Sequence, residues 1–378
     1  MKKRLLSMLL VASMAATMLV GCGGSKETTD NKETTTEATT ETTETTTETT
    51  TETTEETTET VELEDTVVVY TAHPEALLDF VIEGFEEKTG IKVEVLNLGG
   101  DLAERVRSEK DNPQADVMFG QDSATYMALK EEGCLTATTP SWAGELGDYY
   151  KDAEGYWYGT IKTPVMMFYN TEIMSAEEAP KDWKELADAK YDDQVIIRGS
   201  AASSSATLIS CWLDYFTATE TEEAGWDFIT NFDKNVKYYD DVKTLIMQAV
   251  GKGEVAIGIS TLNDIYDNVL NNNLPLKEIY SESGDVVLVD CIGAINNAKH
   301  PNAAAAFIEY AGSAEVQSQI ANQFLRVPTL NSALATSPEW MANEIKALEV
   351  DWVNIGEHKS NWVKTWVSEY MNAEIVTN

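Results

Sequence analysis

The chain has 378 residues with 64 acidic and 27 basic side chains, and its formal net charge is −37 at pH 7. A surface of that sign repels nucleic acid and anionic lipid head groups, so we expect neither as a direct partner. The long remainder after residue 64 suits two lobes better than one hydrophobic core.

The N-terminus has the order of a secretory signal. Met1–Arg4 is basic, and the apolar run Leu5–Val20 is too short to favour a membrane-spanning helix. The run ends in Leu19-Val20-Gly21-Cys22, which resembles the bacterial lipobox, where cleavage precedes the Cys and its thiol carries lipid. The alternative is an ordinary signal peptide with an incidental Cys. We expect a signal peptide over residues 1–21, lipidation at Cys22, and a protein held at the extracellular face of the cell membrane by that lipid alone.

A low-complexity segment follows the signal. Residues 26–60 are almost only Thr and Glu, with no aromatic side chain. Such a segment cannot bury enough apolar surface to offset its ordering entropy, which predicts a disordered linker over residues 22–64.

Strand and helix patterns then alternate. Residues 66–70 form a short β-branched run, apolar residues recur at helical spacing up to Gly90, and residues 91–96 and 115–120 predict two more strands with a helix between them. This β-α-β-α-β order predicts an α/β, doubly wound sheet whose loops 71–75, 98–101 and 120–123 face one crevice.

Several longer motifs resemble one family. They are FEEKTGIKV (85–93), the strand beginning ADV at 115, GTIKTPVMMFYN (159–170), GKGEVAIGIS (251–260) and the unit from 286 to 313. Together they resemble the extracellular solute-binding lipoproteins of bacterial ABC transporters, in the branch that binds ferric iron, sugar phosphates and phosphonates.

The resemblance implies the two-lobed periplasmic-binding-protein type 2 fold. Each lobe is a doubly wound sheet, and two crossing strands near Val165–Tyr169 and Val289–Ala294 act as a hinge. It divides the chain into residues 65–164 (first part of lobe 1), 165–294 (lobe 2 with the hinge strands) and 295–378 (second part of lobe 1 with C-terminal helices). The partners it implies are a small-molecule solute and an ABC permease. We expect a monomer without a cofactor.

The ferric members of the branch hold iron with a His after the first strand, an acid after the third strand and two adjacent Tyr. Here His73 matches the first position, and Gln121 and Asp122 compete for the second. The segment that matches the Tyr pair contains Asn263 and no phenol, and Tyr266 is too far along. Because a ferric ion favours hard oxygen donors, we predict no metal site, with His73 as the residue to use if iron is bound.

The anion half of that site is present. A buried strand at 195–197 leads into Arg198, a turn of small residues and a helix, so free backbone amides at the helix start can bind an oxyanion. The predicted ligand-binding residues here are Arg198, Ser203, Ser204, Ser205 and Thr207. The alternative is that Ser203 only caps the helix.

Only four arginines lie in the folded part. We expect Arg105 and Arg107 to form surface ion pairs, and Arg198 to face the crevice as a planar fork for phosphate. Arg326 lies on a late loop that resembles one returning to the cleft, and a salt bridge that holds this loop is an equal alternative.

Two further positions complete the predicted site. Trp157 precedes the first crossing strand and is predicted to stack on the solute, with packing of the hinge as the alternative. Asp241 follows a strand of the second lobe and is predicted either to contact the solute or to cap the helix after it. The remaining cysteines, Cys134, Cys211 and Cys291, have no CxxC spacing and are expected to be buried free thiols.

No enzyme motif appears among the histidines and serines, so we expect no catalysis. The sequence therefore predicts the extracellular solute-binding component of an ABC importer, which captures a phosphorylated or phosphonate solute by lobe closure. The alternatives are a ferric-iron binder, or a polyamine or cation binder that uses acids such as Asp122, Asp240, Asp241 and Asp264.

Overall fold

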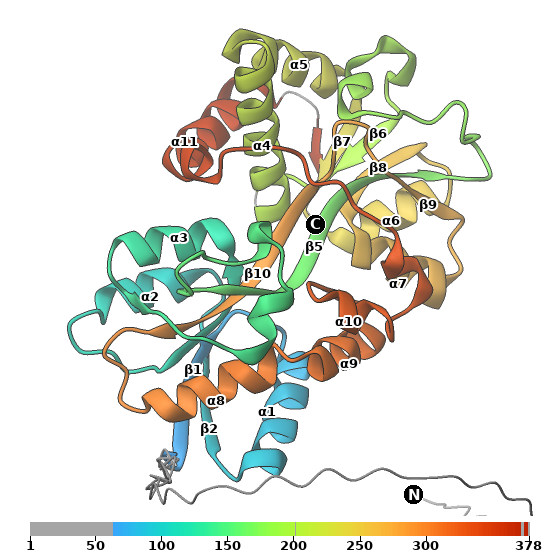
Figure 1. Ribbon diagram of the computed structural model, residues 1–378. Coiled ribbons are helices and arrows are strands. Elements are labelled where there is room, and N and C mark those ends of the chain that lie inside the picture. The colour runs from blue at the N-terminus through green and yellow to red at the C-terminus, as the bar shows by residue number, and fades with distance from the viewer. Residues whose placement is uncertain (1–62, 201, 372–373, 377–378) are drawn as a thin grey trace, which may run out of the picture. The chain divides into compact units, whose positions relative to one another are not determined.

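The computed structural model describes residues 63–200, 202–371 and 374–376. The predicted signal peptide, Cys22 and nearly all of the predicted linker lie outside the described residues. Within the described part the strands form one hydrogen-bonded sheet in the order β12-β7-β6-β8-β5-β10-β3-β1-β2, while β9 and β11 pair with β5 and β4 pairs with β10 (Figure 1). The strands are β1 Thr66–Thr71, β2 Lys92–Asn97, β3 Val117–Asp122, β4 Leu135–Thr136, β5 Tyr158–Asn170, β6 Val195–Ile197, β7 Val236–Asp240, β8 Ile257–Thr261, β9 Leu276–Ile279, β10 Val286–Ile295, β11 Val327–Pro328 and β12 Glu374–Val376.

The helices lie between these strands in chain order. They are α1 Glu75–Thr89, α2 Leu102–Ser108, α3 Ser123–Glu131, α4 Ser203–Thr219, α5 Glu222–Asn235, α6 Lys243–Gly251, α7 Leu262–Asn272, α8 Pro301–Ala311, α9 Ala314–Phe324, α10 Asn331–Leu334 and α11 Trp352–Thr365. The predicted helix end at Gly90 is confirmed, because Gly90 closes α1 with φ 75° and its N–H donates to the Glu86 carbonyl.

The first lobe is a doubly wound sheet. Strand β1 pairs in parallel with both β2 and β3. Val67 and Val69 of β1 pack with α1 and α8, whereas Tyr70 packs with α2 and α3 on the other face. Helices thus cover both faces of β1, which is why Val67–Tyr70 reads as a continuous apolar run, whereas the edge strand β2 is mostly exposed.

Strands β5 and β10 connect the two lobes. They pair antiparallel from Val286 opposite Val165 to Ile292 opposite Tyr158. The later half of β5 pairs with β8 of the second lobe, and the later half of β10 pairs with β3 of the first. The two predicted crossing strands are therefore confirmed as adjacent members of the sheet.

The second lobe has its own parallel strands. Strand β6 pairs in parallel with β7 and with β8. One face packs against α4 and α5 around the buried Trp212, and the other packs against α6 and α7 around Ile246 and Ile265. Here too helices lie on both sides of the strands.

The C-terminal segment differs from the expected division of the chain. Residues 295–378 were expected to return to the first lobe, and α8 does pack there. Ile355 and Trp362 of α11, however, are buried in the second lobe's core, and β12 pairs with β7. The physical reason is the large aromatic surface of α4 and α5, which the apolar side of α11 covers.

The three thiols are confirmed as free and buried. Their burial raises the pKa of each, most strongly for Cys211 and Cys291, which keeps the groups as neutral thiols.

A buried carboxylate joins two distant parts of the first lobe. Asp116, 1% exposed, accepts hydrogen bonds from Val68 N–H (2.7 Å), from the N–H groups of Lys299 and His300 (both 3.0 Å) and from His300 Nδ1 (2.8 Å). We expect Asp116→Ala to lower the free energy of unfolding by about 3 kcal/mol, because buried donors lose their acceptor. Urea denaturation measures this change. The exposed Asp111→Ala is the control, and equal small effects of the two variants would contradict the prediction.

Candidate functional site

The loops that follow β1, β2 and β3 come together, as the strand order predicted. Asn97 Nδ2 donates to the His73 carbonyl at 2.7 Å, and Gln121 Nε2 donates to the Gly99 carbonyl at 2.9 Å. Gly120 has φ +102°, and a Cβ there would lie 3.3 Å from the His73 ring. The backbone of β3 thus approaches the imidazole closely, which only glycine allows at this φ.

His73 is held as a neutral, buried group. Its side chain is 7% exposed and meets the Phe119 ring edge at a centroid distance of 4.3 Å. Burial, with a smaller contribution from the Arg326 charge, lowers the pKa of His73 to about 3. Nε2 is buried and has no hydrogen-bond partner in the described part of the chain. A buried polar atom without a partner is costly, so this nitrogen is a natural contact for a bound polar group.

Asp122 lies at the end of β3, where it caps α3. Its Oδ1 accepts hydrogen bonds from Thr125 N–H at 2.9 Å and from Thr125 Oγ1 at 2.8 Å. The same residue stands opposite Asp290 in the antiparallel pairing of β3 with β10. Two carboxylates therefore face each other across neighbouring strands at the lobe junction.

Asp290 and Arg326 were not among the predicted ligand-binding residues. Asp290 Oδ2 accepts a hydrogen bond from Thr163 Oγ1 at 3.0 Å. The register of β11 with β5 pairs Val327 with Lys162, which brings Arg326 level with Thr163. Burial raises the pKa of Asp290 to about 6, opposed by the Thr163 hydrogen bond and by the Arg326 charge, and assisted by Asp122.

Two of the four arginines form the surface ion pairs that the sequence predicts. Arg105 pairs with Glu109 at 2.5 Å, and Arg107 pairs with Glu104 and Glu132, which confirms the two surface ion pairs. The salt bridge considered for Arg326 is not found among the described residues. The charge of Arg326 lowers the pKa of both His73 and Asp290.

Helix α4 begins without a side-chain cap. Its N-cap is Ala202, which makes no side-chain hydrogen bond, so Ser203 is the first helical residue and does not cap the helix. Ser203 is exposed and Ser204 half-buried, whereas Ser205 and Thr207 are buried. Arg198 lies just before this turn and donates to the Asp241 carbonyl at 3.0 Å, while its buried Nε has no partner in the described part of the chain.

A cation from the C-terminal helix reaches α4. Lys359 Nζ of α11 donates to Thr207 Oγ1 at 2.6 Å. Further along, Asp351 N–H and Asn354 Nδ2 donate to the Asp214 carboxylate at 2.8 and 2.6 Å, so α11 lies alongside α4 (Figure 1). No sequence motif marked Lys359, because its contact with Thr207 spans 152 positions.

Helix α11 packs against both α3, which Asp122 caps, and α4, so the junction and α4 are neighbours. Burial raises the pKa of Cys211, one turn after Thr207, while Lys359 lowers it and Asp214 and Asp122 raise it. Asp122 also raises the pKa of Asp290. Asp122 therefore lies beside the crossing strand β10, and its helix α3 has α11 as a neighbour in common with α4.

The other predicted residues have structural contacts. Trp157 is 2% exposed and packs in the first lobe's core beside Tyr70 and Val289, which favours its packing role. Asn263 donates to Asp264, whose carboxylate also pairs with Lys243 at 2.9 Å. Asp241 packs so closely on Gly199 that a Cβ there would lie 2.7 Å from Oδ1, whereas Asp240 accepts the Val242 N–H. A ligand role for Trp157, Asn263 and Asp241 stays a prediction.

Tyr266, the nearest phenol to the expected iron position, is used elsewhere. Its ring stacks on Trp340 at 4.0 Å, and its hydroxyl donates to Glu278 at 3.1 Å. No group of three or more His, Cys, Asp or Glu side chains that could hold a metal ion occurs among the described residues.

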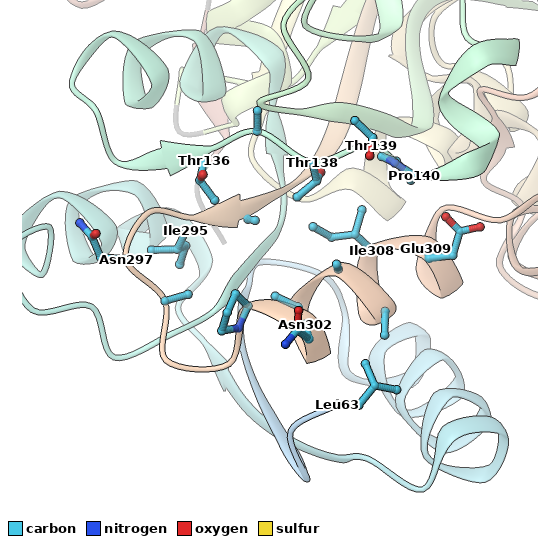
Figure 2. Close-up of a pocket in the computed structure, with 17 residues that line it drawn as sticks. Leu63, Thr136, Thr138, Thr139, Pro140, Ile295, Asn297, Asn302, Ile308 and Glu309 are labelled. Carbon is cyan, nitrogen blue, oxygen red and sulfur yellow. The ribbon is translucent and has the colours of Figure 1, made fainter. Parts of the chain in front are cut away.

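A separate cavity of about 840 Å³ lies on the first lobe. Thr138, Pro140 and Ile308 line it together with the start of α8, and none of the predicted site residues is among its lining residues (Figure 2). Glu309 at its rim already accepts hydrogen bonds from Ser141. The cavity is therefore distinct from the junction of the lobes.

In the part of the chain that the structure describes, no helix is both long and apolar enough to span a membrane.

Comparison with known proteins places these features in context. The family model described as bacterial extracellular solute-binding protein matches residues 81–347. A probable ABC transporter periplasmic-binding protein of Sinorhizobium fredii is 28% identical over 308 residues, 80% of this chain and 86% of the relative. Iron uptake protein A1 of Synechocystis is 26% identical over 65% of this chain and 71% of its own length. The periplasmic binding protein AfuA of Actinobacillus pleuropneumoniae, solved with fructose 6-phosphate bound, superposes with a TM-score of 0.65 at 21% identity, over 82% of this chain and 100% of AfuA.

Proposed function

Since the chain belongs to the family of bacterial extracellular solute-binding proteins, we propose that it serves an ABC importer and captures a small phosphorylated or phosphonate solute. The protein performs no chemistry on that solute. Specificity comes from closing two lobes around it, and the closed form docks on the permease.

One observation carries this proposal, the uncapped start of α4. The first amides of a helix have no intrahelical acceptor, and the helix dipole attracts negative charge to them. Two cations flank this turn, Arg198 before it and Lys359 beside Thr207. In a chain with so large a negative charge, amides and cations gathered at one point favour an oxyanion.

The mechanism follows from the crossing strands. Loops 71–75 and 120–123 of the first lobe and the start of α4 in the second lobe approach each other as β5 and β10 flex. The solute stabilises the closed form because only that form contacts it from both lobes.

The location of the protein is also part of the proposal. We propose that residues 1–21 are removed as a signal peptide and that Cys22 carries the lipid, with residues 22–64 as a linker to the folded part. The support is sequence alone, since these residues lie almost entirely outside the described part.

Ferric iron is the second candidate, because a relative at 26% identity is named an iron uptake protein. Iron would be the transported substrate. Tyr266, the phenol nearest to the expected iron position, is stacked on Trp340 and bonded to Glu278, which favours the anionic solute.

A thermal-shift panel on the folded part tests the proposal. Hexose phosphates, phosphonates, spermidine and ferric citrate are compared, since a ligand at a thousand times its Kd stabilises by about 4 kcal/mol. We expect a phosphoryl or phosphonate compound to raise Tm, and Arg198→Ala or Ser204→Ala to weaken its binding about 10- to 30-fold in calorimetry. Arg105→Ala, on the surface of the first lobe, is the control. A shift with ferric citrate alone, reversed by a chelator, would replace the anion by iron.

A further inference from the structure

The lobe junction carries a row of charged and polar side chains on β3, β10 and β5 and at the residue before β11. From β3 to β11 the row is Asp122, Asp290, Thr163 and Arg326, and we name it the bipolar row. Asp122 pairs with Asp290 in register, and Thr163 Oγ1 donates to Asp290 Oδ2. Continuing the β11–β5 register by one position places Arg326, the residue before β11, level with Thr163. Two acids stand at one end and a guanidinium at the other.

Neither end is neutralised within the described residues. The Thr125 bonds to Asp122 both end on Oδ1, and the Thr163 bond to Asp290 ends on Oδ2. One carboxylate oxygen of each acid is thus left over. Facing carboxylates on adjacent strands repel each other, and a cation between them would remove that repulsion. Arg326 has no hydrogen bond or ion pair in the described part, although a guanidinium has five N–H donors.

Two other features point to a bound molecule rather than to a structural charge pattern. His73 is 7% exposed, its Nε2 has no partner in the described part of the chain, and its ring packs against Phe119 and Gly120 of β3, just before Asp122. The pairing of β10 with both of its neighbouring strands is also irregular just after Asp290. The register with β3 shifts between Asp290 and Ile292, and the register with β5 shifts between Asp290 and Cys291. Such bulges redirect side chains and are common beside binding sites.

We propose that the bipolar row is a second subsite of the crevice and that the solute carries an amine and a carboxylate in addition to its phosphoryl group. The amine binds between Asp122 and Asp290, and the carboxylate binds Arg326. This inference rests on the proposed function, because the phosphoryl group is assigned to the start of α4. The two subsites lie near each other because α11 packs against both α3, which Asp122 caps, and α4.

Three matched probes test the inference by calorimetry. O-Phosphoserine carries all three groups, phosphoethanolamine lacks the carboxylate, and 3-phosphoglycerate has a hydroxyl in place of the amine. We expect O-phosphoserine to bind at least tenfold more tightly than either of the others. Arg326→Gln should remove its advantage over phosphoethanolamine, and Asp290→Asn should remove its advantage over 3-phosphoglycerate. Arg105→Gln and Asp111→Asn are the surface controls.

The outcomes separate the two proposals. Equal affinity for the three probes, or tighter binding of 3-phosphoglycerate, would overturn the bipolar row as a subsite and leave the anion site in place. No binding of any phosphoryl probe would overturn the anion site and this inference together. Arg326→Gln or Asp290→Asn could also lose binding of all three probes while keeping the wild-type urea midpoint. That result would overturn the inference, because the row would then hold the lobes together and would not bind one group of the solute.

Discussion

Replacing Asp285 by Asn is expected to stabilise the folded protein by about 4 kcal/mol at pH 7. Asp285 lies just before β10 and is 1% exposed. Burial raises its pKa to about 8, opposed by the Ser281 hydrogen bond and assisted by the nearby Asp182 carboxylate. The unfolded chain ionises this group near pH 4, so folding at pH 7 must either keep the proton or bury the charge. At about 1.4 kcal/mol per pH unit, the three units between those values give about 4 kcal/mol.

Asn suits the site because it keeps the acceptor and never ionises. Ser281 N–H donates to Asp285 Oδ1 across 3.4 Å, which is a long bond and a weak compensation for a buried charge. Ser283 N–H donates to Asp182 Oδ2 at 2.6 Å and holds that carboxylate, which opposes ionisation of Asp285. The substitution therefore removes the cost of ionisation without creating a cavity.

The raised pKa of Asp285 also determines how the free energy of unfolding changes with pH. A carboxyl group whose folded pKa is raised binds more protons in the folded state, so its contribution to stability falls as pH rises from about 4 to about 8. His73 acts in the opposite sense, since its folded pKa of about 3 makes stability fall as pH drops below about 6.5. Asp290, with a pKa of about 6, adds to the fall in stability caused by Asp285 only below pH 6. Between pH 6.5 and 8 Asp285 acts without these two.

Urea denaturation at pH 6.5 and pH 8 measures the effect. The wild-type free energy of unfolding should fall by about 2 kcal/mol between these values, and Asp285→Asn should remove most of that fall. The exposed Glu282→Gln is the matched control and should leave the fall unchanged. Parallel curves for wild type and Asp285→Asn would show that Asp285 keeps an ordinary pKa.

The parts of the fold that the sequence predicted are those set by local pattern. The apolar spacing of α1 and the αL glycine at its end identify that helix from fifteen consecutive residues. The continuous β-branched run of β1 reports burial on two faces. The meeting of loops 71–75 and 120–123 follows from strand direction alone, because parallel strands end at one edge of a sheet.

The parts that it did not predict depend on contacts between distant segments. Asp290 reads as one polar residue within an apolar strand, and only the pairing of β10 with β3 and β5 brings it beside Asp122 and Thr163. Arg326 could be assigned either to the cleft or to a salt bridge, and the choice needed the register of β11 with β5. Trp157 shows the converse, since an aromatic residue before a crossing strand fits stacking and core packing equally well until its burial is known.

Lys359 is the residue for which we expect the largest loss of solute affinity, about 100-fold in Lys359→Met. Its ammonium group bonds Thr207 in the second turn of α4, near the uncapped amides. A unit charge about 6 Å from an oxyanion, in surroundings of effective dielectric constant about 20, contributes about 3 kcal/mol. Lys359→Arg should keep most of the affinity, and Thr207→Val should lose little, because the charge matters more than the hydroxyl that holds it.

Lys364→Met is the matched control, since Lys364 is an exposed lysine near the end of the same helix. Calorimetry with the phosphoryl compound from the thermal-shift panel gives the affinities, and a salt titration separates charge from packing. A charge effect should shrink as ionic strength rises, so wild type and Lys359→Met should converge at high salt. If Lys359→Met and Lys364→Met bind alike, α11 covers α4 only as a structural element. If only Lys359→Met binds the phosphoryl compound weakly, the C-terminal helix α11 supplies part of the binding site, although it follows the second crossing strand by more than fifty residues.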